Sequence, residues 1–142
     1  MRLIFLIVIG ISSLCYGDFS RDRGVVTDNL TKLQWQDEYG DNNQSAKYTT
    51  WNDSLKFCKT LYLNGRGWRL PTRAELIDII DYGKIDPSID TIFQQTVGFF
   101  YWSITSQAKF KSNAWRISFN SGYSNYSSKL GKSNVRCVRE QK

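Results

Sequence analysis

Near the middle of the chain the sequence reads Trp68-Arg69-Leu70-Pro71-Thr72, followed by Arg73-Ala74-Glu75-Leu76. Pro71 disfavours a helical conformation for the residue before it, so the first part of this stretch is expected to be extended. Thr72 is followed three residues later by Glu75, which is the capping-box pattern of a helix start. The stretch therefore predicts a core anchor formed by Trp68 and Leu70, an Arg69 paired with a nearby carboxylate, and a helix after Thr72.

Two short amphipathic helices are expected around this stretch. In the second helix, Leu76, Ile79 and Ile80 form the predicted buried face, and Gly83 is the expected end. The first helix lies earlier in the chain, with Thr50 as its cap and Asp53 at the positive end of its dipole. Helical spacing predicts that its buried face consists of Trp51, Leu55, Cys58 and Leu61/Tyr62. Gly65 and Gly67 are expected to end this helix.

Short strands are expected on both sides of the helices. Before them, Asp18–Asp22 is interpreted as an exposed lead, Arg23–Asp28 and Lys32–Gln36 as strands, and Glu38–Lys47 as a loop. After Pro87 three segments have a period-two pattern: Phe99–Thr105, Asn113–Asn120 and Asn134–Arg139. Strands, then helices, then antiparallel strands indicate an α+β fold and not an alternating βαβ one.

Composition limits the classes of function. The chain has 142 residues, 19 Lys and Arg against 13 Asp and Glu, a net charge of +6 and no histidine. A His-based triad, a His general base and a His metal site are therefore excluded. This length fits one domain with a real core. The sequence contains no apolar run of 18 residues, so we expect no permanent membrane span.

The first residues have the pattern of a secretory signal. Arg2 supplies the positive start, Leu3–Ile11 is a nine-residue apolar run, and cleavage after Gly17 is expected. The domain organisation is then a signal peptide at 1–17 and a single domain at 18–142. The alternatives are a lipoprotein acylated at Cys15 and an uncleaved anchor. Leu14 is too large for the first alternative, and nine residues are too few to cross about 30 Å of bilayer core.

The predicted secretion also indicates the role of the cysteines. Without the signal, Cys58 and Cys137 remain, an even pair in an oxidising compartment. Cys58 is expected on the buried face of the first helix and Cys137 on the inner face of the last strand. Two thiols without histidine are a poor metal site. The pair is therefore predicted to form a structural disulfide.

A set of short motifs in a fixed order resembles one known family. The chain is similar, over Arg23–Arg139, to a bacterial secreted domain typified by the C-terminal domain of the Legionella collagen-like adhesin. The matching residues are Leu33-Gln34-Trp35-Gln36, Trp51, Cys58, Gly67–Thr72, Glu75-Leu76, Tyr101-Trp102-Ser103, Ala114-Trp115 and Val135-Arg136-Cys137-Val138-Arg139.

This resemblance implies a C-type-lectin-like fold, in the branch that also holds formylglycine-generating enzymes. It implies a small twisted antiparallel sheet with two flanking helices, and chain ends that lie close together. A studied relative is an adhesin toward sulfated glycans, so the resemblance also implies a binding function, although shared fold does not establish shared function.

Two patterns with possible metal chemistry are interpreted as structural. Trp51-Asn52-Asp53 matches a calcium motif of sugar-binding C-type lectins, but here it opens a helix and lacks the accompanying motif. Asp37-Glu38 with Asp41-Asn42-Asn43 supplies oxygen ligands, yet the spacing matches no known calcium loop, so these are interpreted as solvated turn residues. Neither a reactive cysteine pair nor a phosphate loop is present. No metal, no cofactor and no catalysis are therefore expected.

The strongest signal for binding lies in the last third of the chain. Lys109 and Lys111 flank Phe110, and the run Asn120–Asn134 combines tyrosines with serine, asparagine and glycine, a mixture typical of recognition loops. The candidate ligand-binding residues are Lys109, Lys111, Tyr123, Tyr126, Lys129 and Lys132. The alternative interpretation is an edge hairpin whose lysines prevent unwanted strand pairing.

Two functions from different classes remain. The first is a secreted, non-enzymatic module that binds a sulfated or other anionic polysaccharide at a cell surface. The second is a structural or accessory envelope protein that acts through protein–protein contact. Nucleic acid is disfavoured as a partner because of the secretion signal. Convergence of the six candidate residues on one exposed surface would favour the first function, and their separation would favour the second.

Overall fold

A computed structural model of the chain describes residues 17–40 and 47–142. Apart from Gly17, the expected signal peptide lies outside the described residues, as does Asp41-Asn42-Asn43. The described elements follow one another as β1 (Phe19–Asp22), β2 (Val25–Asp28), β3 (Leu33–Gln36), β4 (Lys47–Thr50), α1 (Trp51–Thr60), α2 (Arg73–Asp78), β5 (Phe100–Ser106), β6 (Asn113–Ser118), β7 (Ser124–Ser128), β8 (Lys132–Val135) and β9 (Val138–Glu140).

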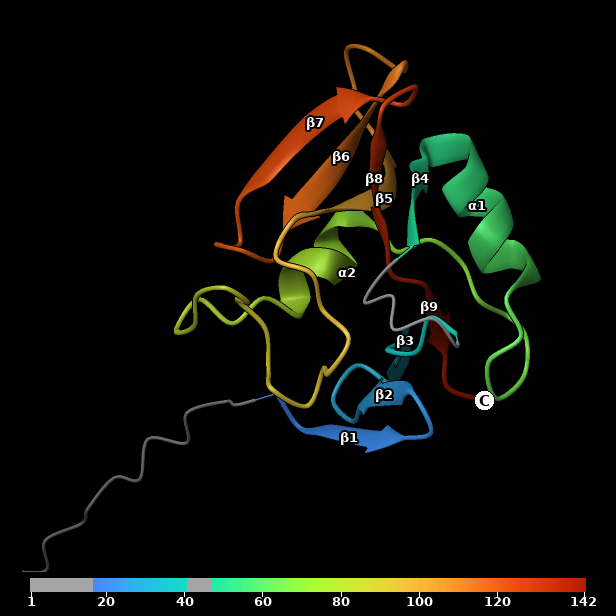
Figure 1. The fold of residues 1–142 in the computed structure, drawn as a ribbon, viewed down its shortest axis with the longest axis vertical. Coiled ribbons are helices and arrows are strands. Elements are labelled where there is room, and N and C mark those ends of the chain that lie inside the picture. The colour runs from blue at the N-terminus through green and yellow to red at the C-terminus, as the bar shows by residue number, and fades with distance from the viewer. Residues whose placement is uncertain (1–16, 41–46) are drawn as a thin grey trace, which may run out of the picture.

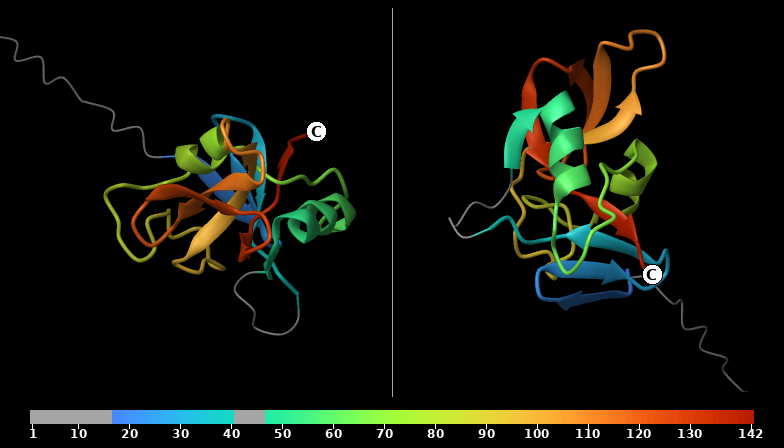
Figure 2. Two further views of the ribbon diagram at one scale, coloured as in Figure 1. Left: turned by 90° about the horizontal axis from the view of Figure 1, so that it is seen from above. Right: turned by 90° about the vertical axis from the view of Figure 1, so that its right-hand side faces the viewer.

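The described strands form two sheets. A four-stranded sheet has the order β1-β2-β3-β9, and a five-stranded sheet has the order β4-β8-β5-β6-β7. All pairs are antiparallel except β5 and β8, which run parallel. Figure 1 shows the four-stranded sheet below and the five-stranded sheet above, and the views of Figure 2 show α1 beside β4. The first and last strands of the chain belong to the same sheet.

The α+β class, the two helices and the disulfide of the sequence prediction are confirmed within the described residues, but the single sheet is wrong. The reason lies in the predicted strand Asn134–Arg139, which is divided at Arg136-Cys137. The Arg136 side chain turns into the interior toward Asp37, and Cys137 is bonded to Cys58. The chain therefore leaves the five-stranded sheet after Val135 and joins the four-stranded sheet at Val138.

The predicted exposed lead at Asp18–Asp22 is also wrong, because most of it is strand β1. β1 pairs with β2 across a two-residue turn at Arg23-Gly24, and both turn residues have positive φ, 44° and 76°. This geometry matches the twist of a hairpin and is usually formed by Asn-Gly or Asp-Gly. The Arg-Gly pair does not carry that signal, so the strand was not predicted.

Both helices begin where the sequence predicts and end earlier. The Thr50 side chain accepts a hydrogen bond from the Asp53 backbone amide, and Thr72 and Glu75 form the complete capping box. α1 ends at Thr60 and not at the glycines. α2 ends at Asp78, because the chain turns at Ile79 and Ile80 pairs with Ile89 in an isolated bridge.

The core has two parts, one against each helix. The part beside α2 contains Trp35, Leu76, Tyr101, Ile117 and Phe119. The part beside α1 contains Cys58, Trp68, Leu70, Trp102 and Cys137. The disulfide between Cys58 and Cys137 closes a loop of 79 residues inside this second part. No helix of the described part is long and apolar enough to cross a membrane.

Arg69 pairs with carboxylates, as expected from the sequence, and thereby joins α2 to the last strand, β9. Its guanidinium donates two hydrogen bonds of 2.8 Å to the Glu75 carboxylate and one of 2.6 Å to Glu140. Burial acts to raise the pKa of Glu75, but hydrogen bonds from Arg69 and Thr72 outweigh it and lower that pKa below its ordinary 4.5. The Arg69 hydrogen bond also lowers the pKa of Glu140.

This arrangement predicts a loss of stability in acid. A carboxylate with a lowered pKa stabilises the fold above its unfolded pKa, near 4.5, and that contribution is lost as the pH falls through the folded pKa. Glu75→Gln keeps the cap acceptor but loses the charge, so we expect about 1 kcal/mol less stability at pH 7. The variant should also lose less stability between pH 5 and pH 3, roughly the range of carboxylate titration. Urea unfolding at several pH values measures both effects, and parallel pH profiles would contradict the assignment.

Candidate functional site

A groove of about 340 Å³ opens on the five-stranded sheet, where β4, β5, β6 and β8 supply its walls. We call it the sheet groove, and its lining residues are Tyr48, Phe99, Phe100, Arg116, Lys132, Ser133 and Asn134. Tyr48 and Phe99 are largely exposed, at 62% and 70%. The groove therefore combines open aromatic surface with two cations.

Arg116 is held in place on three sides. Its Nε donates to the Asn125 side-chain oxygen at 2.8 Å, and its Nη1 donates to Ser133 Oγ at 3.2 Å. Its guanidinium carbon lies 4.2 Å from the centre of the Phe100 ring. Side chains of β5, β7 and β8 thus fix the direction of this cation, so an anion in the sheet groove meets a preorganised donor.

The charge of the sheet groove is not compensated within the described part of the chain. None of the lining residues is acidic, and neither Arg116 nor Lys132 forms an ion pair with a described carboxylate. Burial lowers the pKa of Arg116, yet a guanidinium remains charged at neutral pH. Burial removes water from around the Arg116 guanidinium, and a bound anion would replace those lost interactions with charge-assisted hydrogen bonds. The groove therefore favours anionic ligands.

Two of the six candidate residues predicted from the sequence lie at the sheet groove. Lys132 is one of its lining residues. Tyr123 lies beside it, because its ring meets the Phe100 ring edge to face at 6.5 Å between centroids. Both residues are exposed.

The other three lysines lie away from the groove lining. Lys109 and Lys111 are exposed in the turn between β5 and β6. The Lys129 amine donates to Ser106 Oγ at 2.7 Å and lies 3.9 Å from the centre of the Trp51 ring. Lys129 therefore connects the β7–β8 turn to the end of β5 and the start of α1. Because its amine already contacts Ser106 and the Trp51 ring, it is less available to a ligand.

Tyr126 lies on the opposite face of the sheet from Tyr123. It stands across from Trp115 in the β6–β7 pairing, and the two rings meet edge to face at 5.3 Å. Arg73 covers the Trp115 ring at 3.8 Å. Because successive side chains of a strand alternate between faces, Tyr123 and Asn125 share the Arg116 face and Tyr126 does not. The six candidate residues thus do not share one surface, an outcome that by itself favours the accessory envelope role. A case for ligand binding rests instead on the sheet groove, most of whose lining residues are not among the six.

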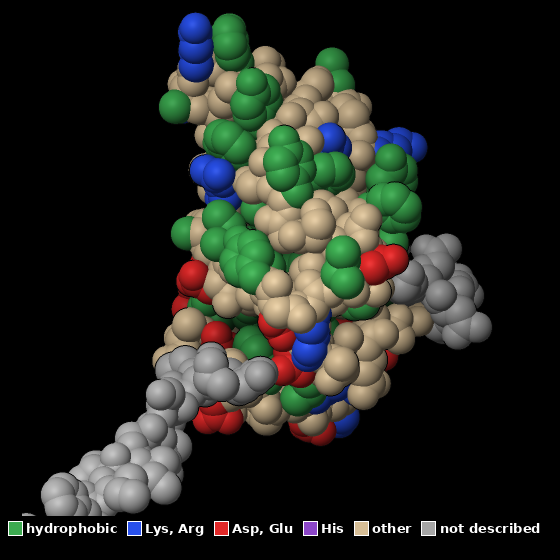
Figure 3. Space-filling model, turned by 90° about the vertical axis from the view of Figure 1, so that its left-hand side faces the viewer, with side chains coloured by type: hydrophobic (Ala, Val, Ile, Leu, Met, Phe, Trp, Pro, Cys, Tyr) green, Lys and Arg blue, Asp and Glu red, His purple; other side chains and the backbone are tan. Residues whose placement is uncertain are grey.

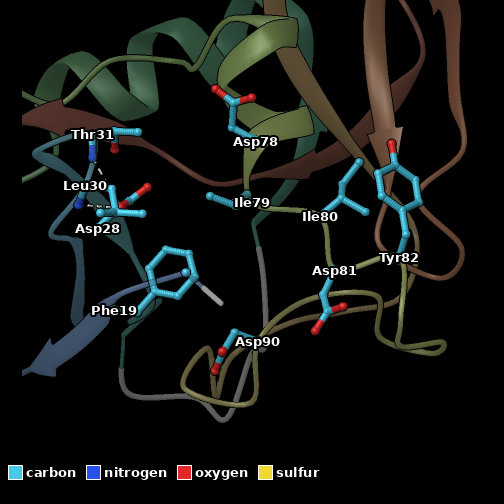
Figure 4. Close-up of a pocket in the computed structure, with 11 residues that line it drawn as sticks. Phe19, Asp28, Leu30, Thr31, Asp78, Ile79, Ile80, Asp81, Tyr82 and Asp90 are labelled. Atoms are coloured by element: carbon cyan, nitrogen blue, oxygen red, sulfur yellow. Dashed lines mark hydrogen bonds between the residues drawn. The ribbon is translucent and has the colours of Figure 1, made fainter. Parts of the chain in front are cut away.

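A second pocket, of about 480 Å³, lies between β1, β2 and the end of α2 and is acidic (Figure 4). Asp28, Asp78, Asp81 and Asp90 surround an apolar floor that includes Phe19. Three of these carboxylates accept backbone amides in tight turns. Among the described residues no cluster of three or more His, Cys, Asp or Glu side chains is arranged to hold a metal ion.

The two pockets differ in the charge of their lining residues. The sheet groove is lined by Arg116 and Lys132 and by no acidic residue, whereas four aspartates line the second pocket. On the face shown in Figure 3, hydrophobic side chains with a few Lys and Arg cover the upper part, and Asp and Glu lie lower down together with further Lys and Arg. An anionic ligand is therefore expected to favour the sheet groove over the second pocket.

Comparison with protein families agrees with the resemblance found in the sequence. The profile of the Lcl C-terminal domain, the C-terminal domain of the Legionella collagen-like protein, matches residues 24–139. The chain belongs to this family. A search of curated proteins found no match. The family match covers both sheets of this Lcl C-terminal domain except β1 and the last residue of β9.

Sequence reasoning missed most of the sheet groove of this Lcl C-terminal domain. It singled out Lys132 and Tyr123 but not Tyr48, Phe100 or Arg116. One signal was available for Arg116, which lies between Trp115 and Ile117 and must face away from them in a strand. Tyr48 carries no such signal, because the strand that presents it was not expected.

Proposed function

We propose that this Lcl C-terminal domain is a secreted, non-enzymatic binding module that acts as an adhesin at a cell surface. Its ligand is an acidic polysaccharide, sulfated or carboxylated, which lies in the sheet groove. The family supports an adhesin-like function, and the sheet groove supports the anionic ligand. Export after cleavage near Gly17 and a C-type-lectin-like fold are part of this proposal. The C-type-lectin-like assignment is supported by three features of the structure: two helices, one disulfide, and first and last described strands that lie in the same sheet.

The observation that carries the proposal is that a fixed cation, Arg116, and a second cation, Lys132, line one groove with open aromatic rings. Charged groups of the ligand would receive charge-assisted hydrogen bonds from Arg116 and Lys132. The apolar faces of sugar rings would lie on Tyr48 and Phe99, whose rings provide large and rigid contact area. A polysaccharide repeats both features along its length, so it suits an open groove better than a closed pocket.

Removing the groove cations is expected to abolish most of the affinity. In the double variant Arg116→Gln/Lys132→Gln, two charge-assisted hydrogen bonds are lost, each worth about 1.5–3 kcal/mol. Affinity for a sulfated polysaccharide should therefore fall by about a hundredfold or more. Surface plasmon resonance against immobilised heparin, at two salt concentrations, measures this change.

The matched control is Lys109→Gln/Lys111→Gln, which removes the same charge from the β5–β6 turn. Long-range attraction to a polyanion is screened beyond about 8 Å at physiological salt, so this control should lose only a few-fold in affinity. Equal losses in the two variants would mean that net charge, and not the sheet groove, binds the ligand. No binding by the parent protein would instead favour the accessory envelope role.

For the aromatic residues of the sheet groove we expect a loss of affinity that does not depend on salt. Tyr48→Ala should weaken binding by about tenfold without changing how affinity depends on salt, because contact with a ring is not screened by ions. The melting temperature should change little, since the side chain is largely exposed. A changed salt dependence would show that Tyr48 acts through the neighbouring cations.

A further inference from the structure

β7 forms an open edge of the five-stranded sheet. It lies last in the strand order, with β6 on one side only, and in Figures 1 and 2 no described element covers its outer side. At one end of the hairpin the Ser118 amide donates to the Tyr123 carbonyl, and at the other the Lys129 amide donates to the Ser112 carbonyl. Odd-numbered residues therefore bond to β6.

The even-numbered residues of β7 consequently point their backbone groups outward. In an antiparallel ladder, residues alternate between those that bond to the neighbouring strand and those that do not. Ser124, Tyr126 and Ser128 thus direct their amides away from β6. Among the described residues, only the Ser128 carbonyl of these three has another backbone partner, the Gly131 amide at 3.0 Å. Such an edge is a template for another strand.

The edge also lacks the usual protection against pairing. Proteins block exposed edges with charges, prolines or bulges. The other edge strands of the described sheets carry charges: Arg21 and Asp22 in β1, Lys47 in β4, and Arg139 and Glu140 in β9. β7 has five residues, all uncharged and none of them proline. The lysines expected to protect this hairpin lie outside the strand, at positions 129 and 132.

We propose that two copies of this chain associate through antiparallel pairing of their β7 strands. The outward residues fit a two-fold axis at Tyr126, which faces Tyr126 of the second copy, while Ser124 faces Ser128 and Asn125 faces Ser127. No like charges meet in this register, so a second copy of the chain fits the edge without repulsion. Pairing joins the two five-stranded sheets into one sheet of ten strands.

The two-fold axis of such a pairing is perpendicular to the sheet, so both sheet grooves open on the same side. If the proposed function holds, the dimer presents two binding grooves to one polysaccharide, and binding at the second groove becomes intramolecular. The contact between two five-residue strands is smaller than that of a stable dimer. Association is therefore weak on its own and strengthened by a ligand that spans both grooves.

The first experiment measures association without ligand. Sedimentation equilibrium of the mature protein over a wide concentration range should show monomers converting into dimers. Tyr126→Lys and Tyr126→Glu each place like charges against each other at the axis, so each variant alone should remain monomeric. A mixture of the two should form a heterodimer, because the axis then joins lysine to glutamate.

The controls separate this contact from folding and from other contacts. Tyr62→Lys makes the same change at an exposed residue outside the strands and should dimerise like the parent, and all variants should keep the parent melting temperature within a few degrees. Hydrogen exchange of the Ser124, Tyr126 and Ser128 amides should slow as the parent concentration rises. A monomeric parent at all concentrations, or a mixture that stays monomeric, would overturn the proposal. Either result leaves the ligand-binding test of the sheet groove unaffected.

Discussion

Replacing Arg136 with methionine is expected to lower the free energy of unfolding by about 3–5 kcal/mol. The Arg136 side chain is fully buried, and its Nη2 lies 3.4 Å from Asp37 Oδ1 and donates to the Gln95 carbonyl at 2.8 Å and to Thr96 Oγ1 at 2.9 Å. Methionine fills much of the volume but leaves the buried Asp37 without this partner. The loss should be at the lower end of the range, because Arg21 still pairs with Asp37 at 2.9 Å.

Arg21→Met is the matched control, because it removes a partly exposed cation from the same carboxylate. Arg21 keeps part of its side chain in water, so solvent can partly replace it beside Asp37 and this variant should lose less stability than Arg136→Met. Chemical unfolding of both variants measures the difference. Equal losses would mean that Asp37 needs only one cation, and that Arg136 contributes through packing against Phe93, whose ring centre lies 4.8 Å away.

The local signals of the sequence predicted the starts of the helices and the central stretch correctly. Thr50 and Thr72 cap the two helices, Trp68 and Leu70 are buried, and Arg69 pairs with Glu75. These features depend on neighbours a few residues apart, so sequence alone carries them. Strand β7 has polar residues on both faces and therefore no period-two pattern, which is why it was not predicted.

The buried Arg136 shows why the second sheet was missed. Alternation placed Val135 and Cys137 on one buried face, and both are fully buried. The same alternation does not indicate that the residue between them is buried too. Arg136 is buried against Asp37, which lies 99 positions earlier and supplies its counter-charge. Asp37 was expected to be a solvated turn residue, and this is wrong, because its carboxylate is fully buried. A partner so distant in sequence leaves no local pattern, and the division of the last strand depends on it.

The sheet groove was only partly predictable for a similar reason. Its four strands come from distant parts of the chain, and their order, β4-β8-β5-β6, differs from the order in sequence. The basic and aromatic run at Asn120–Asn134 pointed to the correct sheet and to Lys132. It also pointed to Tyr126, which the strand geometry places on the other face.

Removing the disulfide is expected to be the other large effect on stability. In the variant Cys58→Ala/Cys137→Ala the free energy of unfolding should fall by about 2–5 kcal/mol, the range for native disulfides of small secreted domains. The bond closes a loop of 79 residues, so its loss frees much of the unfolded chain. Both sulfurs are also buried among the side chains that pack α1 against the sheet.

Reduction of the parent protein supplies the control for this prediction. If the bond itself stabilises the fold, a reductant should lower the stability of the parent by a similar amount and leave the alanine variant unchanged. Titration of the folded parent with a thiol reagent should find no free thiol at Cys58 or Cys137. Two reactive thiols in a parent that unfolds at the same denaturant concentration as the variant would contradict the prediction. In that case packing of α1 by Leu55, Phe57 and Trp51, and not the covalent bond, would hold the helix to the sheet.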